Sequence, residues 1–166
     1  TGKTTLVYSL LNHLDEKVKT VFVFHTTITF NDLLKTILRE LDLTAVKEDK
    51  WDLVHQLIQY LVLIGTKGET LAIIIDEAQS LSPKLMEDLQ MFLNLEPKVI
   101  QIIFVGQPEL EDKLNSEDLK YLKQIIKIRR KIKELSEEES KEYIDHRLRL
   151  VGSSSSEIFT SKAISM

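Results

Sequence analysis

The stretch LAIIIDE, residues 71–77, constrains the fold of this chain more than any other feature of the sequence. Its first five residues are all apolar, so an extended strand here presents apolar side chains on both faces. Strands of this kind lie inside parallel sheets that are covered by helices on both sides. Two acids, Asp76 and Glu77, follow at the carboxyl end. The stretch therefore predicts a central strand of an α/β fold.

Strand and helix patterns alternate around this stretch. Residues 19–25 and 99–106 are rich in β-branched and aromatic side chains, which predicts two more buried strands. Amphipathic helical spacing falls between the predicted strands, in residues 6–14, 30–41, 54–62 and 85–93, and a polar helical stretch runs over residues 108–123. This alternation predicts an α/β domain with a mostly parallel sheet.

Short local signals mark where several helices start and stop. Capping residues or a Ser before Pro indicate helix starts at Thr29–Asp32, Ser82–Pro83 and Ser136–Glu139. Gly65 and Gly152 are the expected stops. We expect two helices between the first two strands, and we expect the second of these helices to end at Gly65.

The carboxyl-terminal part of the chain changes character. Residues 126–133 alternate between isoleucine and basic side chains, which predicts a further strand. A final helix runs to Gly152, four serines suggest a linker, and the last ten residues begin another helical pattern.

Composition excludes several classes of site. The chain of 166 residues has no cysteine, so disulfides and thiolate metal sites are excluded. No apolar run is long enough for a transmembrane helix, so we expect no membrane contact from this segment. A net charge of −4 gives no global reason to expect nucleic acid as a partner. The histidines lack metal-ligand spacing, and no serine-hydrolase motif is present.

Gly2-Lys3-Thr4 matches the second half of a phosphate-binding loop. In such a loop, backbone N–H groups at a helix start face the phosphates, the lysine reaches the β- and γ-phosphates, and the Thr hydroxyl binds Mg²⁺. By itself the tripeptide is a weak signal, because a chain of this length contains one by chance with a probability of roughly one in ten.

The acid pair after the central strand strengthens this interpretation. Asp76 at the strand end can orient the shell of Mg²⁺, and Glu77 can polarise the attacking water. Solvation of a strand end is the simpler reading of either acid alone. Together with the Gly-Lys-Thr helix start, the pair indicates a nucleotide site that uses ATP and Mg²⁺.

Two further features have open alternatives. Gln107, just after the third predicted strand, is either a residue that orients water near the γ-phosphate or a turn residue before Pro108. The segment from Lys120 to Lys133 contains seven basic residues and no acid. It is either a solvated sheet edge or a nucleic-acid strip, although it lacks the interleaved aromatic residues of stacking platforms.

The segment LAIIIDEAQSLSPKLMEDLQMFLNLEPKVIQIIFVGQPELEDKL resembles the AAA+ ATPases of the general-secretion-pathway protein A (ExeA) type, and LSEEESKEYIDHRLRLVG is similar to the start of their lid. The resemblance runs from Gly2 to Gly152. It implies a P-loop NTPase fold with a three-layer αβα parallel sheet, in which residues 1–134 form the nucleotide-binding core and residues 135–166 begin a helical lid. It also implies a homo-oligomer.

The resemblance assigns roles by position. Gly2, Lys3, Thr4 and Thr5 would hold the phosphates of ATP, and Thr4 and Asp76 would bind Mg²⁺. Among the catalytic residues, Lys3 would neutralise phosphate charge, Glu77 would activate water and Gln107 would occupy the first sensor position. Arg147 falls where such lids place a phosphate-sensing arginine.

Two departures from the family pattern carry expectations. Ile125 stands where relatives carry an arginine that is a candidate trans-acting finger, so Arg129 or Arg130 would have to substitute for it. The first glycine of the loop and the strand before it are absent, which indicates an N-terminally truncated fragment that binds ATP weakly or not at all by itself. The predicted sheet then pairs its first three strands contiguously and leaves residues 126–133 without a neighbour.

The sequence leaves three functions in view. The first is an ATPase module of a bacterial secretion-pathway protein that acts with secretion-system partners, located in the cytoplasm or in the cytoplasmic domain of an inner-membrane protein. The second is a TniB-like transposition helper ATPase that binds DNA through its basic segment. The third, suggested by Ile125, is a nucleotide switch or scaffold without hydrolysis.

Overall fold

A computed structural model describes residues 2–24, 28–45, 48–94 and 98–152. The chain divides into two units, one of residues 2–129 and one that begins at Arg130, and each is described by itself.

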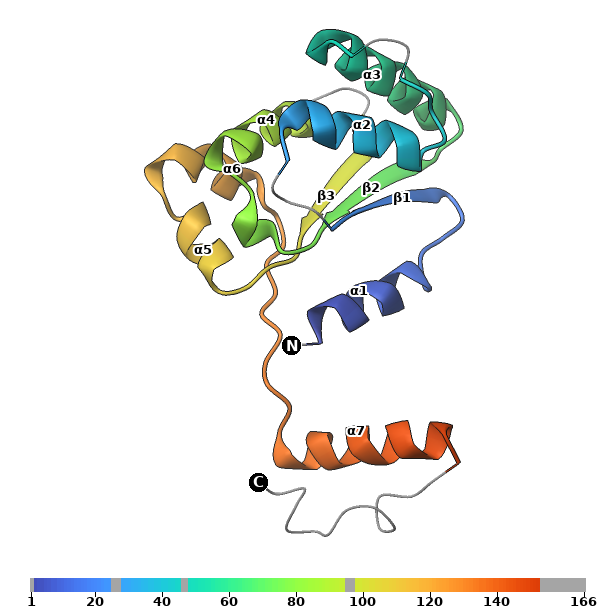
Figure 1. Ribbon diagram of the computed structural model, residues 1–166, viewed down its shortest axis with the longest axis vertical. Coiled ribbons are helices and arrows are strands. Elements are labelled where there is room, and N and C mark those ends of the chain that lie inside the picture. The colour runs from blue at the N-terminus through green and yellow to red at the C-terminus, as the bar shows by residue number, and fades with distance from the viewer. Residues whose placement is uncertain (1, 25–27, 46–47, 95–97, 153–166) are drawn as a thin grey trace. The chain divides into compact units, whose positions relative to one another are not determined.

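The first unit is built on a parallel sheet whose described strands are β1 (Val18–Val23), β2 (Thr70–Ile75) and β3 (Ile100–Phe104), in the order β1-β2-β3 (Figure 1). Val23 pairs with Ile75, and Ile75 pairs with Phe104, so the carboxyl ends of the strands meet at one edge. Five residues of β2, Leu71 to Ile75, are buried. The structure confirms the predicted central strand and the contiguous pairing.

Helices cover both faces of this sheet, as the αβα prediction requires. On one face, α2 (Phe30–Glu40) packs on β1, α3 (Lys50–Thr66) on β2 and α4 (Pro83–Leu93) on β3. On the other face lies α1 (Lys3–Leu11), whose Tyr8 ring stacks on Phe22 of β1 with ring centroids 5.9 Å apart. Figure 1 shows α1 and α2 on opposite sides of the strands.

The core lies between the sheet and the face covered by α2, α3 and α4. The helical stripes predicted from apolar spacing supply most of its fully buried side chains, which include Leu33, Leu34, Ile37, Leu38, Leu57, Leu61, Leu89 and Phe92. Their inward-facing strand partners are Val21, Val23, Ile73 and Ile75. Burial of this apolar area is the main term that stabilises the layered fold.

Predicted caps hold the helix starts. Thr29 and Asp32 form a full capping box for α2, and the Ser82 hydroxyl accepts from the Leu85 N–H at 3.1 Å ahead of Pro83. These groups satisfy N–H groups that a helix start otherwise leaves unpaired.

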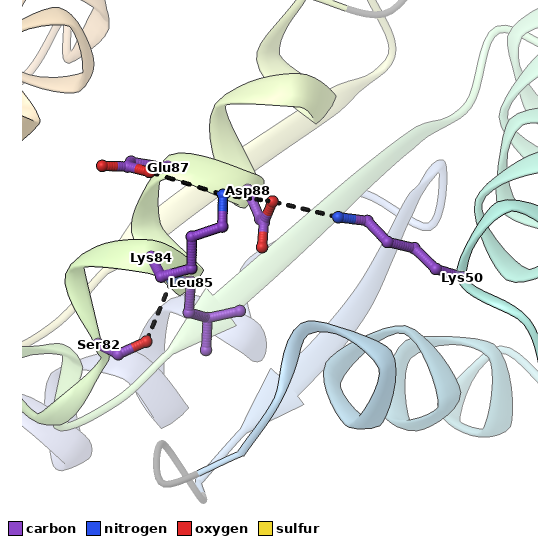
Figure 2. Close-up of polar contacts among 6 residues, drawn as sticks. All are labelled: Lys50, Ser82, Lys84, Leu85, Glu87 and Asp88. Carbon is purple, nitrogen blue, oxygen red and sulfur yellow. Dashed lines mark hydrogen bonds and ion pairs between the residues drawn. The ribbon is translucent and has the colours of Figure 1, made fainter.

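An ion pair joins the start of α3 to α4. The Lys50 ammonium lies 3.2 Å from the Asp88 carboxylate, which also pairs with Lys84 of its own helix at 3.4 Å (Figure 2). Lys50 also lies over the Phe30 ring, 4.7 Å from its centroid. These contacts connect α2, α3 and α4 at one end of the helical layer.

Several element boundaries differ from the predictions. Residues 126–133 form no strand, contrary to the prediction, and none of the described strands pairs with them, as the predicted sheet requires. Gly65 lies inside α3, because the residue that reverses the chain with a positive φ of 69° is Gly68. The polar stretch 108–123 is divided into α5 (Glu109–Leu114), the 3₁₀ turn η2 (Glu117–Leu119) and α6 (Lys120–Ile125). His25 at the end of the first predicted strand, the linker of four serines and the helix expected in the last ten residues lie outside the described residues.

The second unit contains α7 (Glu137–Leu150), which starts at the predicted capping box of Ser136 and Glu139. Gly152 follows the helix with a φ of 76°, as its predicted role as a stop requires. None of the residues of α7 is buried. Its assignment to a lid that begins at residue 135 stays a prediction.

A search of the described helices finds none whose length and apolar content would let it cross a membrane.

Truncation of Leu57 in α3 tests the core. Leu57 is fully buried, so Leu57→Ala should lower the free energy of unfolding by about 2–5 kcal/mol in urea denaturation. Leu63→Ala on the same helix is the control, because Leu63 is 51% exposed and its truncation should cost under about 0.5 kcal/mol. Equal costs at the two positions would contradict this packing.

The capping box of α2 predicts a pH dependence. The Thr29 hydroxyl and N–H both donate to Asp32 and lower the pKa of this carboxyl below its ordinary 3.8. The resulting stabilisation is present above that ordinary value and is lost as pH falls through the lowered pKa of the folded state. Thr29→Val should therefore lower the urea midpoint at pH 7 and have a smaller effect near pH 3.

Thr66→Val is the matched control, because the Thr66 hydroxyl donates to the backbone carbonyl of Leu63, a group that does not titrate. Its effect on the urea midpoint should not vary with pH in this range. A Thr29→Val effect that is equally independent of pH would exclude the proposed linkage to Asp32.

Candidate functional site

The carboxyl ends of β2 and β3 place a group of polar residues on two neighbouring loops. Asp76 and Glu77 follow β2 directly, and Gln107 follows β3 after two residues. Two backbone hydrogen bonds hold the loops together, from Val105 N–H to Ile75 O and from Ala78 N–H to Val105 O, each 2.9 Å long. This edge of a parallel α/β sheet is where ligands usually bind in such folds.

Asp76 connects this edge to the start of α1. The Thr4 hydroxyl donates to Asp76 Oδ2 at 2.9 Å, although the two residues are 72 positions apart in the chain. Asp76 is 5% exposed, and among the described residues it is the one charged or polar side chain that is buried. Its other oxygen accepts from the Glu77 N–H at 2.8 Å, and its own N–H donates to Val23 O at 3.0 Å. Thr4 and Asp76 were both predicted from the sequence, and the structure brings them into contact.

The chemistry of this pair suits a hard divalent cation. A hydroxyl and a carboxylate oxygen are ligands that Mg²⁺ prefers, and Mg²⁺ sites in nucleotide enzymes commonly use one or two protein oxygens, the rest coming from phosphate and water. No cluster of three or more His, Asp or Glu residues that could hold a metal by itself is found within the described ranges. The residues present therefore fit Mg²⁺ that is shared with a phosphate ligand.

The first turn of α1 has the features of an anion site. Gly2 precedes it with a φ of 83°, a left-handed conformation that glycine adopts without strain, and the turn contains no acidic residue and no side-chain cap. Gly2 has no side chain that could occupy the first N–H groups of the helix, and the helix dipole favours negative charge there. Lys3 is half-buried and Thr5 is exposed in this turn.

Glu77 is held in an unusual conformation. Its backbone is left-handed, with a φ of 51°, which is uncommon for a residue other than glycine and is found at functional sites more often than elsewhere. Its Oε2 atom accepts from Gln79 Nε2 at 2.5 Å and from Gln107 Nε2 at 3.1 Å. The hydrogen bond from Gln79, that from Gln107 and the positive charge of Lys3 lower the pKa of Glu77 below its ordinary range. Its carboxylate is therefore anionic at neutral pH.

Sequence reasoning missed two residues of this site. The first is Gln79 in the turn η1 (Ala78–Ser80), which contacts both Glu77 and Gln107. The second is Lys113 of α5, whose ammonium donates to the backbone carbonyls of Gln79 and Leu81. The segment that resembles the AAA+ ATPases contains Gln79, but only the fold shows that the side chain two residues after Glu77 turns back toward it.

The remaining predicted residues belong to later parts of the chain. Arg147 lies exposed on α7, in the second unit, so its contact with phosphate stays a prediction. Ile125 ends α6, and the Arg129 guanidinium donates to the Lys123 carbonyl at 2.8 Å. Arg130, the other candidate substitute for the missing arginine, is exposed.

Comparison with known proteins agrees with this geometry. Residues 1–114 match a protein family described as AAA domain. The chain is 33% identical to general secretion pathway protein A of Aeromonas hydrophila over 168 residues, which is 99% of this chain and 30% of that protein. It thus spans less than a third of the length of this relative.

Solved structures show the same fold. The ORC2 protein of Aeropyrum pernix in its ADPNP-ADP complexes superposes with a TM-score of 0.72 and 18% identity, over 90% of this chain and 42% of that one. The ADP form of the same protein gives a TM-score of 0.64 and 18% identity, over 90% of this chain and 43% of that one. With a family match over more than half of its length and this α/β architecture, the chain belongs to the AAA domain family of P-loop ATPases.

Proposed function

We propose that this chain is the module that binds and hydrolyses ATP in a bacterial secretion-pathway protein, and that it couples hydrolysis to conformational work in a homo-oligomer. The observation that carries the proposal is the hydrogen bond from Thr4 to Asp76, which joins the two halves of a nucleotide site across 72 positions of sequence. A buried carboxylate that meets the hydroxyl of a Gly-Lys-Thr turn is the arrangement that Mg²⁺-dependent phosphoryl chemistry uses.

Binding of ATP would use the first turn of α1. The N–H groups after Gly2 and the ammonium of Lys3 would hold the phosphates, with the Thr5 hydroxyl beside them. Thr4 and Asp76 would hold Mg²⁺, which supplies neutralisation of the phosphate charge when bound. The lowered pKa of Glu77, to which Lys3 contributes, supports the placement of this lysine near the reacting groups.

Hydrolysis would depend on Glu77 and Gln107. An anionic Glu77 carboxylate can accept a hydrogen bond from water and align it for attack on the γ-phosphate. The Gln107 amide lies 3.1 Å from this carboxylate and can contact the same water or the γ-phosphate. Arg147 would reach the phosphates from the lid, and Arg129 or Arg130 would replace the missing arginine at Ile125 in a neighbouring subunit.

The secretion role rests on the relative from Aeromonas hydrophila, whose name places it in a general secretion pathway. We infer the same cellular setting for this chain, in the cytoplasm or in the cytoplasmic domain of an inner-membrane protein, with secretion-system proteins as partners.

A second function has one observation in its favour. Lys127, Arg130, Lys131 and Lys133 are all exposed, so the basic segment could contact the phosphates of DNA as in a TniB-like transposition helper. A nucleotide switch without hydrolysis is the third alternative. DNA binding that falls steeply with salt would favour the second function, and absence of ATP turnover by the full-length oligomer would favour the third.

Lys3 and Glu77 variants of the natural full-length protein separate binding from hydrolysis. Lys3→Ala should abolish ATP binding, measured with a fluorescent ATP analogue, because the main positive charge at the phosphates is lost. Glu77→Gln should keep ATP binding and lower kcat at least about 100-fold, since glutamine keeps the shape of the side chain but cannot act as a general base.

Lys67→Ala is the matched control, because Lys67 is an exposed lysine at the amino-terminal end of β2, the opposite edge of the sheet. It should leave both binding and kcat unchanged. Substantial turnover by Glu77→Gln would remove the assignment of Glu77 as the residue that activates water.

The Thr4 hydroxyl predicts a change in metal requirement. Thr4→Val keeps the shape of the side chain and loses the oxygen, so the Mg²⁺ concentration for half-maximal turnover should rise about 10-fold or more. Thr4→Ser keeps the oxygen and should behave as the natural protein does. Identical Mg²⁺ titrations for the valine and serine variants would contradict a metal role for Thr4.

A further inference from the structure

We propose that Gln79 is a positioning residue for hydrolysis: its side-chain amide holds the Glu77 carboxylate and the loop of Gln107 in one fixed arrangement. This inference rests on the proposed ATPase function and adds to it a residue that neither the sequence motifs nor the comparisons assign.

The Gln79 amide uses both of its ends. Nε2 donates to Glu77 Oε2 at 2.5 Å, and Oε1 accepts from the backbone N–H of Gln107 at 3.1 Å. A carboxylate can only accept and a backbone N–H can only donate, so these two partners determine which way the amide faces. The Gln107 side chain donates to the same Glu77 oxygen at 3.1 Å, which closes a ring of three hydrogen bonds between the β2 and β3 loops.

The backbone that carries Gln79 is also anchored. Lys113 of α5 donates to the carbonyl of Gln79 and, at 2.7 Å, to the carbonyl of Leu81. Ala78, the residue before Gln79, is fully buried and bonds to Val105 O at 2.9 Å. The Gln79 side chain thus extends toward Glu77 from a backbone that is held in place.

Gly106 leaves room for the side-chain amide of Gln79. A Cβ atom at Gly106 would lie 2.9 Å from Gln79 Oε1 and 2.9 Å from Leu110 Cδ2, closer than such atoms approach in proteins. Leu110 is buried and has little room to move, so a methyl group at position 106 would displace the Gln79 amide. The β3 loop therefore accommodates Gln79 in this position only with glycine at 106.

Positioning matters because Glu77 is exposed to solvent and has a long side chain. Without a partner, its carboxylate would sample several rotamers, and few of them would face the water that must attack the γ-phosphate. Misplacement of a reacting group by about 1 Å can cost about 100-fold in rate. Gln79 holds the carboxylate beside Gln107, so the two proposed catalytic groups converge on one place.

The test is steady-state ATP hydrolysis by the natural full-length protein. Gln79→Met has a similar length and lacks both hydrogen bonds, so it should lower kcat about 10- to 100-fold and change the KM for ATP less than about 3-fold. Gln79→Glu keeps the acceptor for the Gln107 N–H, places a negative charge beside Glu77, and should lower kcat at least as far. Gln59→Met, an exposed glutamine on α3, is the control. Unchanged kcat, raised kcat, or an effect on KM alone would overturn the proposal.

A second measurement needs no turnover. Hydrogen exchange of the Gln107 backbone N–H in the nucleotide-free protein should become faster in Gln79→Met, because this N–H loses its acceptor. It should not change in Gln59→Met. Gly106→Ala should speed the same exchange and lower kcat, since it displaces the amide without removing it. Equal exchange of the Gln107 backbone N–H in all variants would overturn the proposal that Gln79 holds this loop.

The two measurements keep this inference separate from the proposed function. If the natural protein hydrolyses ATP and the Gln79 variants do so equally well, the inference fails and the ATPase assignment stands. If the natural protein shows no turnover, the ATPase assignment fails. The role of Gln79 in positioning groups for hydrolysis then fails with it, whatever the hydrogen exchange of Gln107 shows.

Discussion

Burial of β2 on both faces is the constraint on which the rest of the structure depends. α3 packs on this strand, and β1 and β3 pair with its two edges, so its apolar side chains lie in the interior of the fold. The buried run extends one residue past the strand to Asp76 and stops at Glu77, which is exposed. A charged group at that depth needs a partner, and Thr4 supplies it. The hydrophobic core and the candidate site are therefore consequences of the same strand.

The site gains its order from hydrogen bonds between loops rather than from regular structure. Glu77 departs from β2 in a left-handed conformation, which turns its carboxylate toward the two glutamine amides. Gln79 and Gln107 come from different loops, and Lys113 fastens the first of these loops to α5. These contacts hold in place much of the geometry that the proposed chemistry needs.

The sequence predicted what depends on local spacing. Apolar stripes such as Leu33 to Leu38, the capping box at Thr29 and the buried strand before Asp76 all have patterns of a few residues, and the structure contains each of them. It did not predict what depends on tertiary partners. The predicted sheet already leaves residues 126–133 without a partner strand, and their alternation alone does not produce a strand, because backbone groups without a ladder gain nothing from extension. Gln79 was missed for the same reason, since its role follows from a turn that brings Gln107 beside it.

The edge of the sheet where Thr4 meets Asp76 is expected to bind Mg²⁺ and a nucleoside triphosphate. Its most direct test is a crystal structure of the natural full-length protein with Mg²⁺ and a non-hydrolysable ATP analogue. We expect a metal ion about 2 Å from Thr4 Oγ1, with Asp76 in its coordination or water shell and the phosphates along the first turn of α1. An ordered triphosphate bound elsewhere, or a metal that contacts neither Thr4 nor Asp76, would contradict it.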